Sequence, residues 1–350
     1  MIPYVLIFFY ASFLFFKRKR DYDNLLSITY LIIIILFSGF RDMIGGYDIY
    51  IYGDIFESKK FEYPALEKGY LLYNNVLSFF SNDRQFLFFV TSLLIGVLHY
   101  LIIQKFSPVL SFSLFILFCK FYLMSFVYLR QGLAMGIIWL SIPYIQKRKF
   151  LIFLLLSFLA YSFHKSSIIF LPTYFLYNIK IKNKQLIIIL GVMLFISLTP
   201  LKIIFSPLIS RIKEESFSFE YPLNYFYIIE ILLILFTMLK YNANDNDEKL
   251  NFIRNGLFLY LLTTCIGLNN STFIRLNWYF LIFLCLYLPY VYISIKNLKI
   301  KNLAKKLIYC YFALLFLRLL LIWDGGDFLP YKSIFQNFER HGRWEYLEYK

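Results

Sequence analysis

Long apolar runs, separated by short polar breaks, follow one another along the chain. An α-helix needs about 20 apolar residues to cross the hydrocarbon core of a bilayer, and several runs approach that length. The breaks contain Lys, Arg, Asn, Asp or Pro, as loops between helices do. The pattern predicts an all-α polytopic membrane protein with about twelve transmembrane helices. They are expected near residues 2–16, 25–40, 86–104, 109–128, 131–146, 150–163, 166–179, 185–200, 223–240, 252–267, 276–294 and 307–323.

The polar breaks also predict how the chain is oriented. Lys and Arg gather in every second break, for example at 146–149 and 296–306, and this bias is typical of cytoplasmic loops. The breaks that alternate with these basic ones are either long or carry one isolated basic residue. We therefore expect residues 1–350 to form a single polytopic membrane domain with both termini outside. The expected extracytoplasmic segments are the loops 41–85 and 201–222 and the C-terminal tail 324–350.

Composition agrees with a membrane protein and excludes other classes. Of the 350 residues, 60% are hydrophobic and only 16% are charged, which is far from the composition of a soluble domain. The formal net charge is +15, but the basic residues lie in short groups between apolar runs, which argues against nucleic-acid binding. The four Cys lie inside apolar runs without CxxC spacing, and no carboxylate cluster stands out. Neither a disulfide framework, a metal nor another cofactor is expected.

Unusual charges at the predicted outer face are the first candidates for chemistry. Arg41 ends the second apolar run, and Asp48 follows across Gly45-Gly46, a pair that permits a tight turn back to the membrane surface. We expect such a turn to help form a site. The alternative interpretation makes Arg41 an interfacial anchor and Asp48 a solvated loop acid.

Arg130 and Arg275 each stand at the outer start of an apolar run. A guanidinium suits phosphate recognition because its planar fork of donors meets two oxygens at once and keeps its charge. His164 stands at another outer helix end, where its imidazole can accept a proton from a sugar hydroxyl, and Lys165 adds positive charge beside it. The alternatives are snorkelling arginines and a histidine that only caps a helix.

Three more charged residues, Lys120, Glu230 and Arg318, lie within apolar runs. Because ionisable groups are costly in hydrocarbon, we expect them to face the bundle interior and to be paired. Mutual neutralisation of Lys120 and Glu230 is the favoured interpretation, so all three rank as secondary candidates. The outer-face group of arginines, acid and histidine instead predicts an anionic substrate, a diphosphate that arrives from the lipid. Fixed arginines can stabilise a departing diphosphate without a metal ion.

Several short motifs occur in a fixed order along nearly the whole chain. "R-x₆-D-x-Y" begins at Arg41 and contains Asp48, and "E-x-G-Y-x₃-N" runs from Glu67 through Tyr70 to Asn74. "RQGLA" follows at 130–134, then "FHKSSIIFLP" at 163–172, Arg275 and "PYKSIF" at 330–335. In this order the motifs resemble those of the EpsG family, which belongs with Wzy-type polysaccharide polymerases.

The resemblance implies a polymerase of O-antigen, capsule or exopolysaccharide in the bacterial inner membrane. Such an enzyme transfers a growing glycan from undecaprenyl diphosphate to an incoming lipid-linked repeat unit, in a metal-independent helical fold like that of C-type glycosyltransferases. The resemblance also implies a chain-length regulator as a partner. The family pattern implies that arginines hold the diphosphates and that Asp48 or His164 activates the acceptor hydroxyl. The implied diphosphate ligands are Arg41, Arg130, Arg275 and Lys165, with Glu67 and Tyr70 as secondary candidates.

The sequence is also compatible with two other classes of protein. A flippase for lipid-linked oligosaccharides also needs many helices and a basic cavity, but it should show internal repeats and charges at the midplane. The two halves of this chain show no such repeat, and its unusual charges favour one face. An O-antigen ligase differs mainly in its acceptor, which the sequence does not identify.

Overall fold

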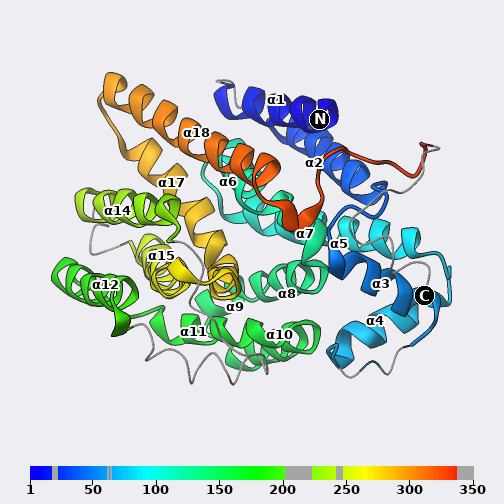
Figure 1. Cartoon of the computed structure of the whole chain (residues 1–350). Coiled ribbons are helices and arrows are strands. Elements are labelled where there is room, and N and C mark those ends of the chain that lie inside the picture. The colour runs from blue at the N-terminus through cyan, green and yellow to red at the C-terminus, as the bar shows by residue number, and fades with distance from the viewer. Residues whose placement is uncertain (18–22, 61–62, 64, 202–222, 242–246, 337–350) are drawn as a thin grey trace.

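The computed structural model describes the chain except for residues 18–22, 61–62, 64, 202–222, 242–246 and 337–350. Within the described ranges the fold is all-α, as predicted, and the only strand-like pairing there is an isolated bridge between Arg41 and Ser333. Helices lie side by side in a bundle, and the short helices α3 and α4 lie together at one side of it (Figure 1).

The N-terminal half of the chain begins with two apolar helices, α1 and α2, that contact each other. The long helix α5 packs against α2 and α8, and a π-helical stretch, η1, follows α6. The bounds are α1 Ile2–Phe16, α2 Asp23–Gly39, α3 Tyr47–Glu57, α4 Lys68–Ser78, α5 Arg84–Phe106, α6 Leu110–Leu117, η1 Phe118–Tyr122, α7 Met124–Val127, α8 Leu129–Trp139 and α9 Ile142–Gln146.

The C-terminal half contains the most deeply buried helices. α17 and the 3₁₀-helix η5 before it are enclosed by α15, α6 and α5. The bounds are α10 Phe150–Phe163, η2 Lys165–Phe170, α11 Pro172–Leu176, α12 Asn183–Leu198, α14 Tyr225–Lys240, α15 Glu248–Ile266, η4 Gly267–Asn269, α16 Ser271–Ile274, η5 Arg275–Phe280, α17 Leu281–Ser294, α18 Leu298–Leu321 and η6 Asp324–Gly326.

The predicted segments fall on helical parts of the chain, but some of them are divided and some differ at their ends. The segment 109–128 contains α6, η1 and α7, and the segment 131–146 contains most of α8 and all of α9. α18 begins at Leu298 instead of 307, because the side chain of Asn297 caps it by accepting hydrogen bonds from the backbone of Lys299 and Ile300. The segment 166–179 is not one α-helix but the 3₁₀-helix η2 followed by the short α11, which begins at a proline. The first turns of α18 contain several lysines, so an apolar run does not mark the residues where this helix begins.

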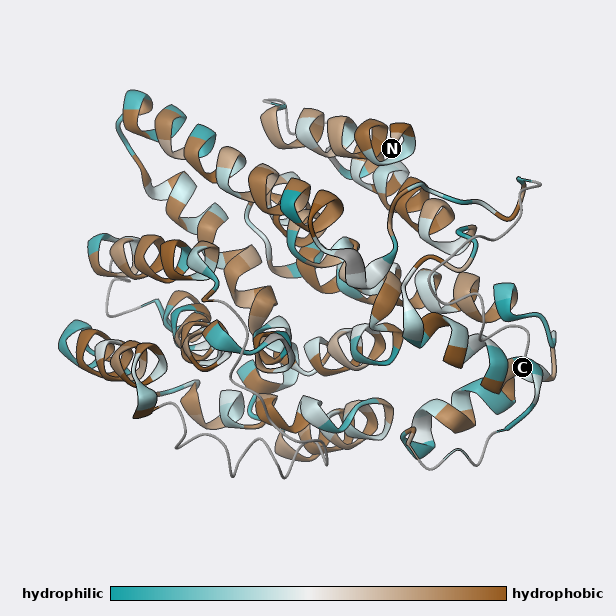
Figure 2. Cartoon of the chain, viewed as in Figure 1, coloured by the Kyte–Doolittle hydropathy of each residue, from teal (hydrophilic) through white to brown (hydrophobic). Residues whose placement is uncertain are grey.

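Among the residues that the structure describes, two helical stretches are long and apolar enough to cross a membrane by themselves, Arg84–Phe106 and Thr272–Ser294. The shorter apolar helices run over Ile2–Phe16, Asn24–Gly39, Leu110–Tyr122, Phe150–Phe163 and Asn183–Leu198. Their apolar side chains face outward as well as inward, so the outside of the bundle is strongly hydrophobic (Figure 2). This surface is that of a membrane protein. Twelve separate crossings stay a prediction.

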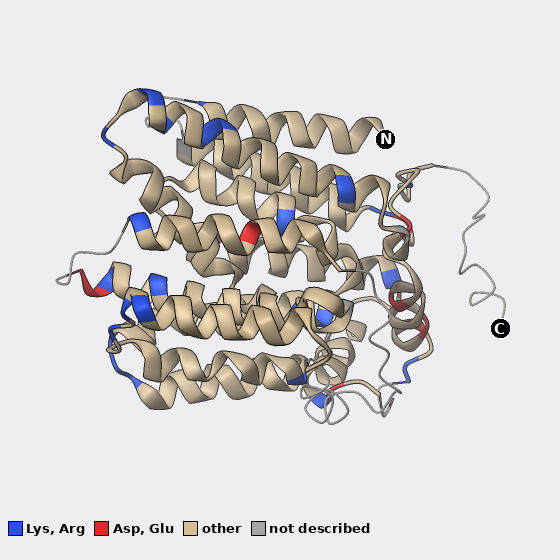
Figure 3. Cartoon of the chain, turned by 60° about the vertical axis from the view of Figure 1, so that its left-hand side comes forward, with Lys and Arg blue, Asp and Glu red and all other residues tan. Residues whose placement is uncertain are grey.

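Charge is distributed unevenly between the two ends of the bundle (Figure 3). Lys and Arg gather at one end, called here the basic end, where α9 leads into α10 and where α18 begins. The opposite end carries α3 and α4, which form within the predicted loop 41–85. Most of the predicted loop 201–222, and the part of the predicted tail after residue 336, lie outside the described residues.

Candidate active site

Three ionisable residues that lie far apart in sequence meet at the end of the bundle that carries α3 and α4. Glu67 precedes α4, Arg130 lies in the first turn of α8, and His164 follows α10. The Oε1 atom of Glu67 lies 3.0 Å from Nδ1 of His164 and accepts a hydrogen bond of 3.1 Å from the backbone N–H of Lys165. The Oε2 atom accepts a hydrogen bond from Nη1 of Arg130. One carboxylate therefore joins three helices.

Gly69 explains how Glu67 comes so close to α10. A Cβ at this position would lie 2.2 Å from the Ser162 hydroxyl oxygen and 2.7 Å from the Ser162 carbonyl oxygen, which is closer than atoms can approach. Without a side chain at Gly69, the start of α4 packs directly against the end of α10. The glycine and the glutamate of the "E-x-G-Y" motif therefore serve one purpose, the junction with His164.

The pKa values of Glu67 and His164 indicate which of the two side chains carries the proton between them. Burial raises the pKa of Glu67, but the hydrogen bond from His164 and the charge of Arg130 outweigh burial and lower it to about 2. An ionised carboxylate can only accept, so Nδ1 of a neutral His164 must carry the proton, and Nε2 keeps its lone pair. Burial and the nearby charges of Arg130 and Arg275 lower the pKa of His164, against the raising effect of Glu67. His164 is therefore set up as a neutral base.

Arg130 also ties α8 to α3. Its Nε donates a hydrogen bond of 3.0 Å to the Tyr52 hydroxyl, and its guanidinium lies 5.5 Å from the centre of the Tyr52 ring. Burial raises the pKa of Tyr52 to about 12, with Arg130 lowering it in part and Asp48 raising it. Asp48, in the first turn of α3, thus lies within electrostatic range of this group. Tyr70 is fully buried and packs edge-on against Tyr52.

Arg275 adjoins the same group from the side of η5. Its backbone carbonyl accepts a hydrogen bond of 2.8 Å from the side chain of Gln131, the neighbour of Arg130. Its guanidinium lies 4.7 Å from the centre of the Tyr128 ring. Since Tyr128 is the residue from which α8 starts, both arginines are placed by the start of the same helix.

A cavity of about 270 Å³ lies beside Arg275 and contains a second arginine, Arg318. Arg318 donates a hydrogen bond of 3.1 Å to the Asn224 side chain, and its guanidinium lies 5.0 Å from the centre of the Phe226 ring. Asparagines and tryptophans line much of the remaining wall. Positive charge, amide groups and aromatic rings are suited to a diphosphate joined to a sugar. The other polar and aromatic lining residues are Tyr128, Asn224, Tyr227, Asn269, Asn270, Trp278 and Trp323.

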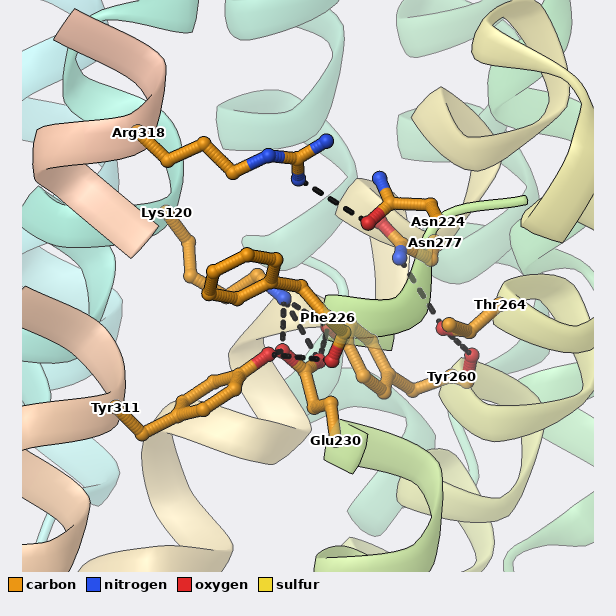
Figure 4. A network of polar contacts seen from close by, with 9 residues as sticks. All are labelled: Lys120, Asn224, Phe226, Glu230, Tyr260, Thr264, Asn277, Tyr311 and Arg318. Atoms are coloured by element: carbon orange, nitrogen blue, oxygen red, sulfur yellow. Dashed lines mark hydrogen bonds and ion pairs between the residues drawn. The ribbon is translucent and has the colours of Figure 1, made fainter. Parts of the chain in front are cut away.

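Lys120 and Glu230 form an ion pair in the bundle interior, and Figure 4 shows it below the hydrogen bond between Arg318 and Asn224. Lys120 lies on η1, and its Nζ is 2.7 Å from both carboxylate oxygens and 2.6 Å from the Tyr260 hydroxyl. The hydroxyls of Tyr260 and Tyr311 donate to the two oxygens of Glu230. Only 1% and 2% of the two charged side chains are exposed. Complete pairing of this kind is what lets charges persist in an apolar interior.

Arg41 has a different environment from the other arginines. Its side chain is fully buried, and Nε donates to the Ile44 carbonyl at 2.9 Å while Nη2 donates to the Phe126 carbonyl at 3.0 Å. Nη1 donates to the Ser38 carbonyl. Arg41 thus joins the end of α2, the Gly45-Gly46 turn and α7, which leads into α8. The positive φ angles of both glycines agree with the tight turn expected there.

The structure therefore brings together most of the predicted outer-face candidates. The side chains of the other two, Arg41 and Lys165, lie apart from this group. Glu67, Arg130, His164 and Arg275 gather with Asp48 nearby. Arg41 is instead buried between the end of α2 and α7, and Lys165 contributes its backbone N–H and leaves its side chain exposed. Neither the cavity nor the roles of Tyr52, Gln131 and Asn224 as hydrogen-bond partners could be predicted from the sequence. One signal of the cavity is present in the sequence, the pair Asn269-Asn270 shortly before Arg275, and both asparagines line the cavity. Within the described residues, no three His, Cys, Asp or Glu side chains gather as a metal site.

An all-α bundle with a hydrophobic outside and a charged site at one end defines a helical membrane protein. The chain belongs to the EpsG family, and the match covers residues 24–333. This family is related to the Wzy-type polymerases, so the protein is a membrane protein of polysaccharide biosynthesis that resembles a polysaccharide polymerase. No curated protein and no solved structure matches the chain.

Proposed function

We propose that this protein is a polysaccharide polymerase that transfers a growing glycan from undecaprenyl diphosphate to an incoming lipid-linked repeat unit. One observation carries the proposal: in a member of the EpsG family, Glu67 holds His164 and Arg130 together beside Arg275, at the end of the bundle opposite the basic end. This group combines a base with cations suited to a diphosphate leaving group.

The proposed reaction uses His164 as the general base. Its Nε2 takes the proton from the acceptor hydroxyl, and the acceptor oxygen attacks the anomeric carbon of the donor glycan. The bond between that carbon and the diphosphate oxygen breaks, and its electron pair leaves with the diphosphate. Glu67 orients the imidazole and favours the protonated form that results, as the carboxylate of a catalytic triad does. Asp48 is the alternative base.

Arg275 and Arg318 are proposed to bind the departing diphosphate in the cavity between them. They supply fixed positive charge where negative charge develops, so neither a metal nor another cofactor is needed in this scheme. Arg130 is proposed to contact the donor diphosphate from the other side, with Lys165 at the rim. Arg41 is proposed as a positioning residue, because it fixes α7 and thereby the start of α8, which carries Arg130.

The proposed location is the bacterial inner membrane, with the basic end in the cytoplasm and both termini outside. A chain-length regulator is a proposed partner. Single cysteines introduced by Ser81→Cys and Lys149→Cys, in a Cys310→Ser background that removes the exposed native thiol, test the orientation. An impermeant maleimide added to intact cells or spheroplasts should label residue 81 and spare residue 149. The reverse pattern contradicts the orientation.

Gene deletion followed by analysis of lipid-linked glycans tests the proposed activity. The deletion strain should keep single repeat units on the carrier and lose long polymer. Wild-type protein should restore the polymer, whereas Arg130→Ala and Arg275→Ala at normal protein levels should not. Polymer of unchanged length in the deletion strain contradicts the proposal.

Two other outcomes identify the alternative functions. Repeat units that accumulate on the cytoplasmic leaflet indicate a flippase. Polymer of normal length that is no longer attached to its final acceptor indicates a ligase.

A further inference from the structure

A second, separate cavity opens between α14, α17 and α18 toward the basic end of the bundle. Its volume is about 250 Å³, and its wall is almost entirely apolar. Leu233, Phe236, Leu303 and Leu307 line it and are more than half exposed, so the cavity faces the surroundings of the bundle. We call it the α14–α18 groove. None of the groups that we assign to polymerisation lines it.

The polar contacts between α14 and α18 lie at one end of this groove. The Tyr311 hydroxyl donates to the Glu230 carboxylate and, at 3.2 Å, to the Phe226 carbonyl, and Arg318 donates to Asn224. These bonds join the two helices in the half that is farther from the basic end. In the other half the helices do not pack closely against each other, and the groove lies between them.

The depth of the groove matches one leaflet of a bilayer. Glu230 and Tyr311 line its inner end, and Lys240 lines its mouth. Ten residues of α14 separate Lys240 from Glu230, and ten residues of α18 separate Lys301 from Tyr311; ten helical residues span about 15 Å. The hydrocarbon core of a bilayer is about 30 Å thick, so one leaflet has the same depth. A lipid chain that enters at the basic end would end at the Glu230–Tyr311 hydrogen bond.

The mouth of the groove is positively charged. Nζ of Lys301 lies 4.8 Å from the centre of the Tyr292 ring, and Tyr292 lines the groove. Lys240 lies on the opposite wall, at the end of α14. Within the described part of the chain, neither lysine forms an ion pair with an acidic side chain. Both ammonium groups are therefore positioned to meet an anionic headgroup.

We infer that the α14–α18 groove binds one anionic phospholipid from the leaflet around the basic end. Its acyl chain fills the groove up to Tyr311, and its phosphate lies between Lys240 and Lys301. Basic pockets between membrane helices on one side of the bilayer have the chemistry to bind such headgroups. Because surrounding lipid is as apolar as the groove, the lysines rather than the apolar wall provide the preference for this lipid. The bound lipid fills the space where α14 and α18 do not touch.

Native mass spectrometry of the purified full-length protein tests the inference. The probes are phosphatidylglycerol and phosphatidylcholine with identical acyl chains, and undecaprenyl phosphate. Wild-type protein should retain phosphatidylglycerol on the order of tenfold better than phosphatidylcholine, because two lysines attract the anionic headgroup. The double variant Lys240→Gln/Lys301→Gln should lose this preference. The matched double variant Lys147→Gln/Lys149→Gln, at the same end but away from the groove, should keep it.

Filling the groove gives an independent test. Ala304→Trp should lower retention of phosphatidylglycerol, because the indole would occupy the groove. Leu303→Trp, at a more exposed position of the same wall, should have the same effect and serves as the second variant in case Ala304→Trp does not fold. Leu155→Trp, an exposed leucine on α10, is the control. Equal retention of the two phospholipids by wild type overturns the inference. So does an equal loss of the preference for phosphatidylglycerol in the two double lysine variants. If undecaprenyl phosphate displaces phosphatidylglycerol from wild-type protein but does not bind to Ala304→Trp, the occupant of the groove is a polyprenyl chain and not a phospholipid.

Discussion

Glu67 Oε1 and His164 Nδ1 lie 3.0 Å apart, although 97 positions separate the two residues in the sequence. The same carboxylate binds Arg130, so one acid holds both a candidate base and a candidate phosphate ligand. This geometry makes Glu67, which was only a secondary candidate in the sequence, the centre of the proposed site. The consequences can be measured residue by residue.

Loss of the Glu67 carboxylate should strongly reduce polymer formation. In Glu67→Gln the imidazole of His164 loses the group that fixes its tautomer and stabilises its charged form, and we expect activity to fall about a hundredfold or more, as it should in His164→Ala. The measurement is the amount of long polymer at matched protein levels. Glu57→Gln is the control, because Glu57 also pairs with an arginine, Arg84, on the same side of the molecule but outside the site. An equal defect in both glutamate variants contradicts the role of Glu67.

The pH dependence of the rate should report the His164 protonation. Activity requires the neutral base, so the rate should fall as pH drops through the pKa of His164, which lies below its ordinary value of 6.5. Glu67 raises this pKa, so Glu67→Gln should lower it further and move the acid limb to lower pH, in addition to lowering the maximal rate. Rates of purified wild-type and Glu67→Gln protein on a lipid-linked substrate, measured between pH 5 and 8, give the acid limb of each. An unmoved limb argues for Asp48 as the base.

Gly69→Ala should disrupt the site without removing a functional group. The new Cβ would meet Ser162 at 2.2 Å, and because the Ser162 backbone carbonyl is also within 2.7 Å, α4 must move away from α10. We expect Glu67 and His164 to separate and polymer formation to fall at least tenfold, at nearly unchanged protein level. Gly191→Ala on α12 meets nothing within 4 Å and should behave as wild type. Normal polymer in Gly69→Ala speaks against the proposed junction.

The interior ion pair should behave as a unit in stability measurements. Lys120→Met or Glu230→Gln alone leaves a buried charge without its partner, which should cost about 3–5 kcal/mol of unfolding free energy. The double variant Lys120→Met/Glu230→Gln removes both charges and should recover most of the loss. Thermal unfolding in detergent gives the comparison. Additive losses in the double variant contradict the coupling that the 2.7 Å contacts imply.

Arg41 and Arg318 should differ in the kind of defect that they cause. Arg41 is fully buried, so Arg41→Ala leaves backbone carbonyls of three segments without a donor and should lower stability on the order of 3 kcal/mol. Arg318→Ala, at the edge of a cavity, should leave stability nearly unchanged but weaken retention of undecaprenyl diphosphate. Thermal unfolding and lipid retention of both variants separate the two roles. A stable Arg41→Ala protein that fails only in lipid retention would make Arg41 a direct ligand.

The sequence by itself determined the all-α fold and most helix positions, because apolar runs of helical length cannot remain in water and satisfy their backbone only as helices. It also singled out His164, Arg130 and Arg275 as charges at helix ends. It did not reveal α3 and α4 within 41–85 or the early start of α18. Those helices are amphipathic or rich in lysine, so an apolar run does not mark them.

Only the tertiary structure decided which charges work together. Spacing along the chain carries no information on whether Glu67 meets His164 or whether Arg41 is buried, because both outcomes depend on how separate helices pack. The close approach at Gly69 brings Glu67 to α10, and the carbonyls of Ser38, Ile44 and Phe126 surround Arg41. The cavity between Arg275 and Arg318 likewise exists only because η5 and α18 are neighbours in space.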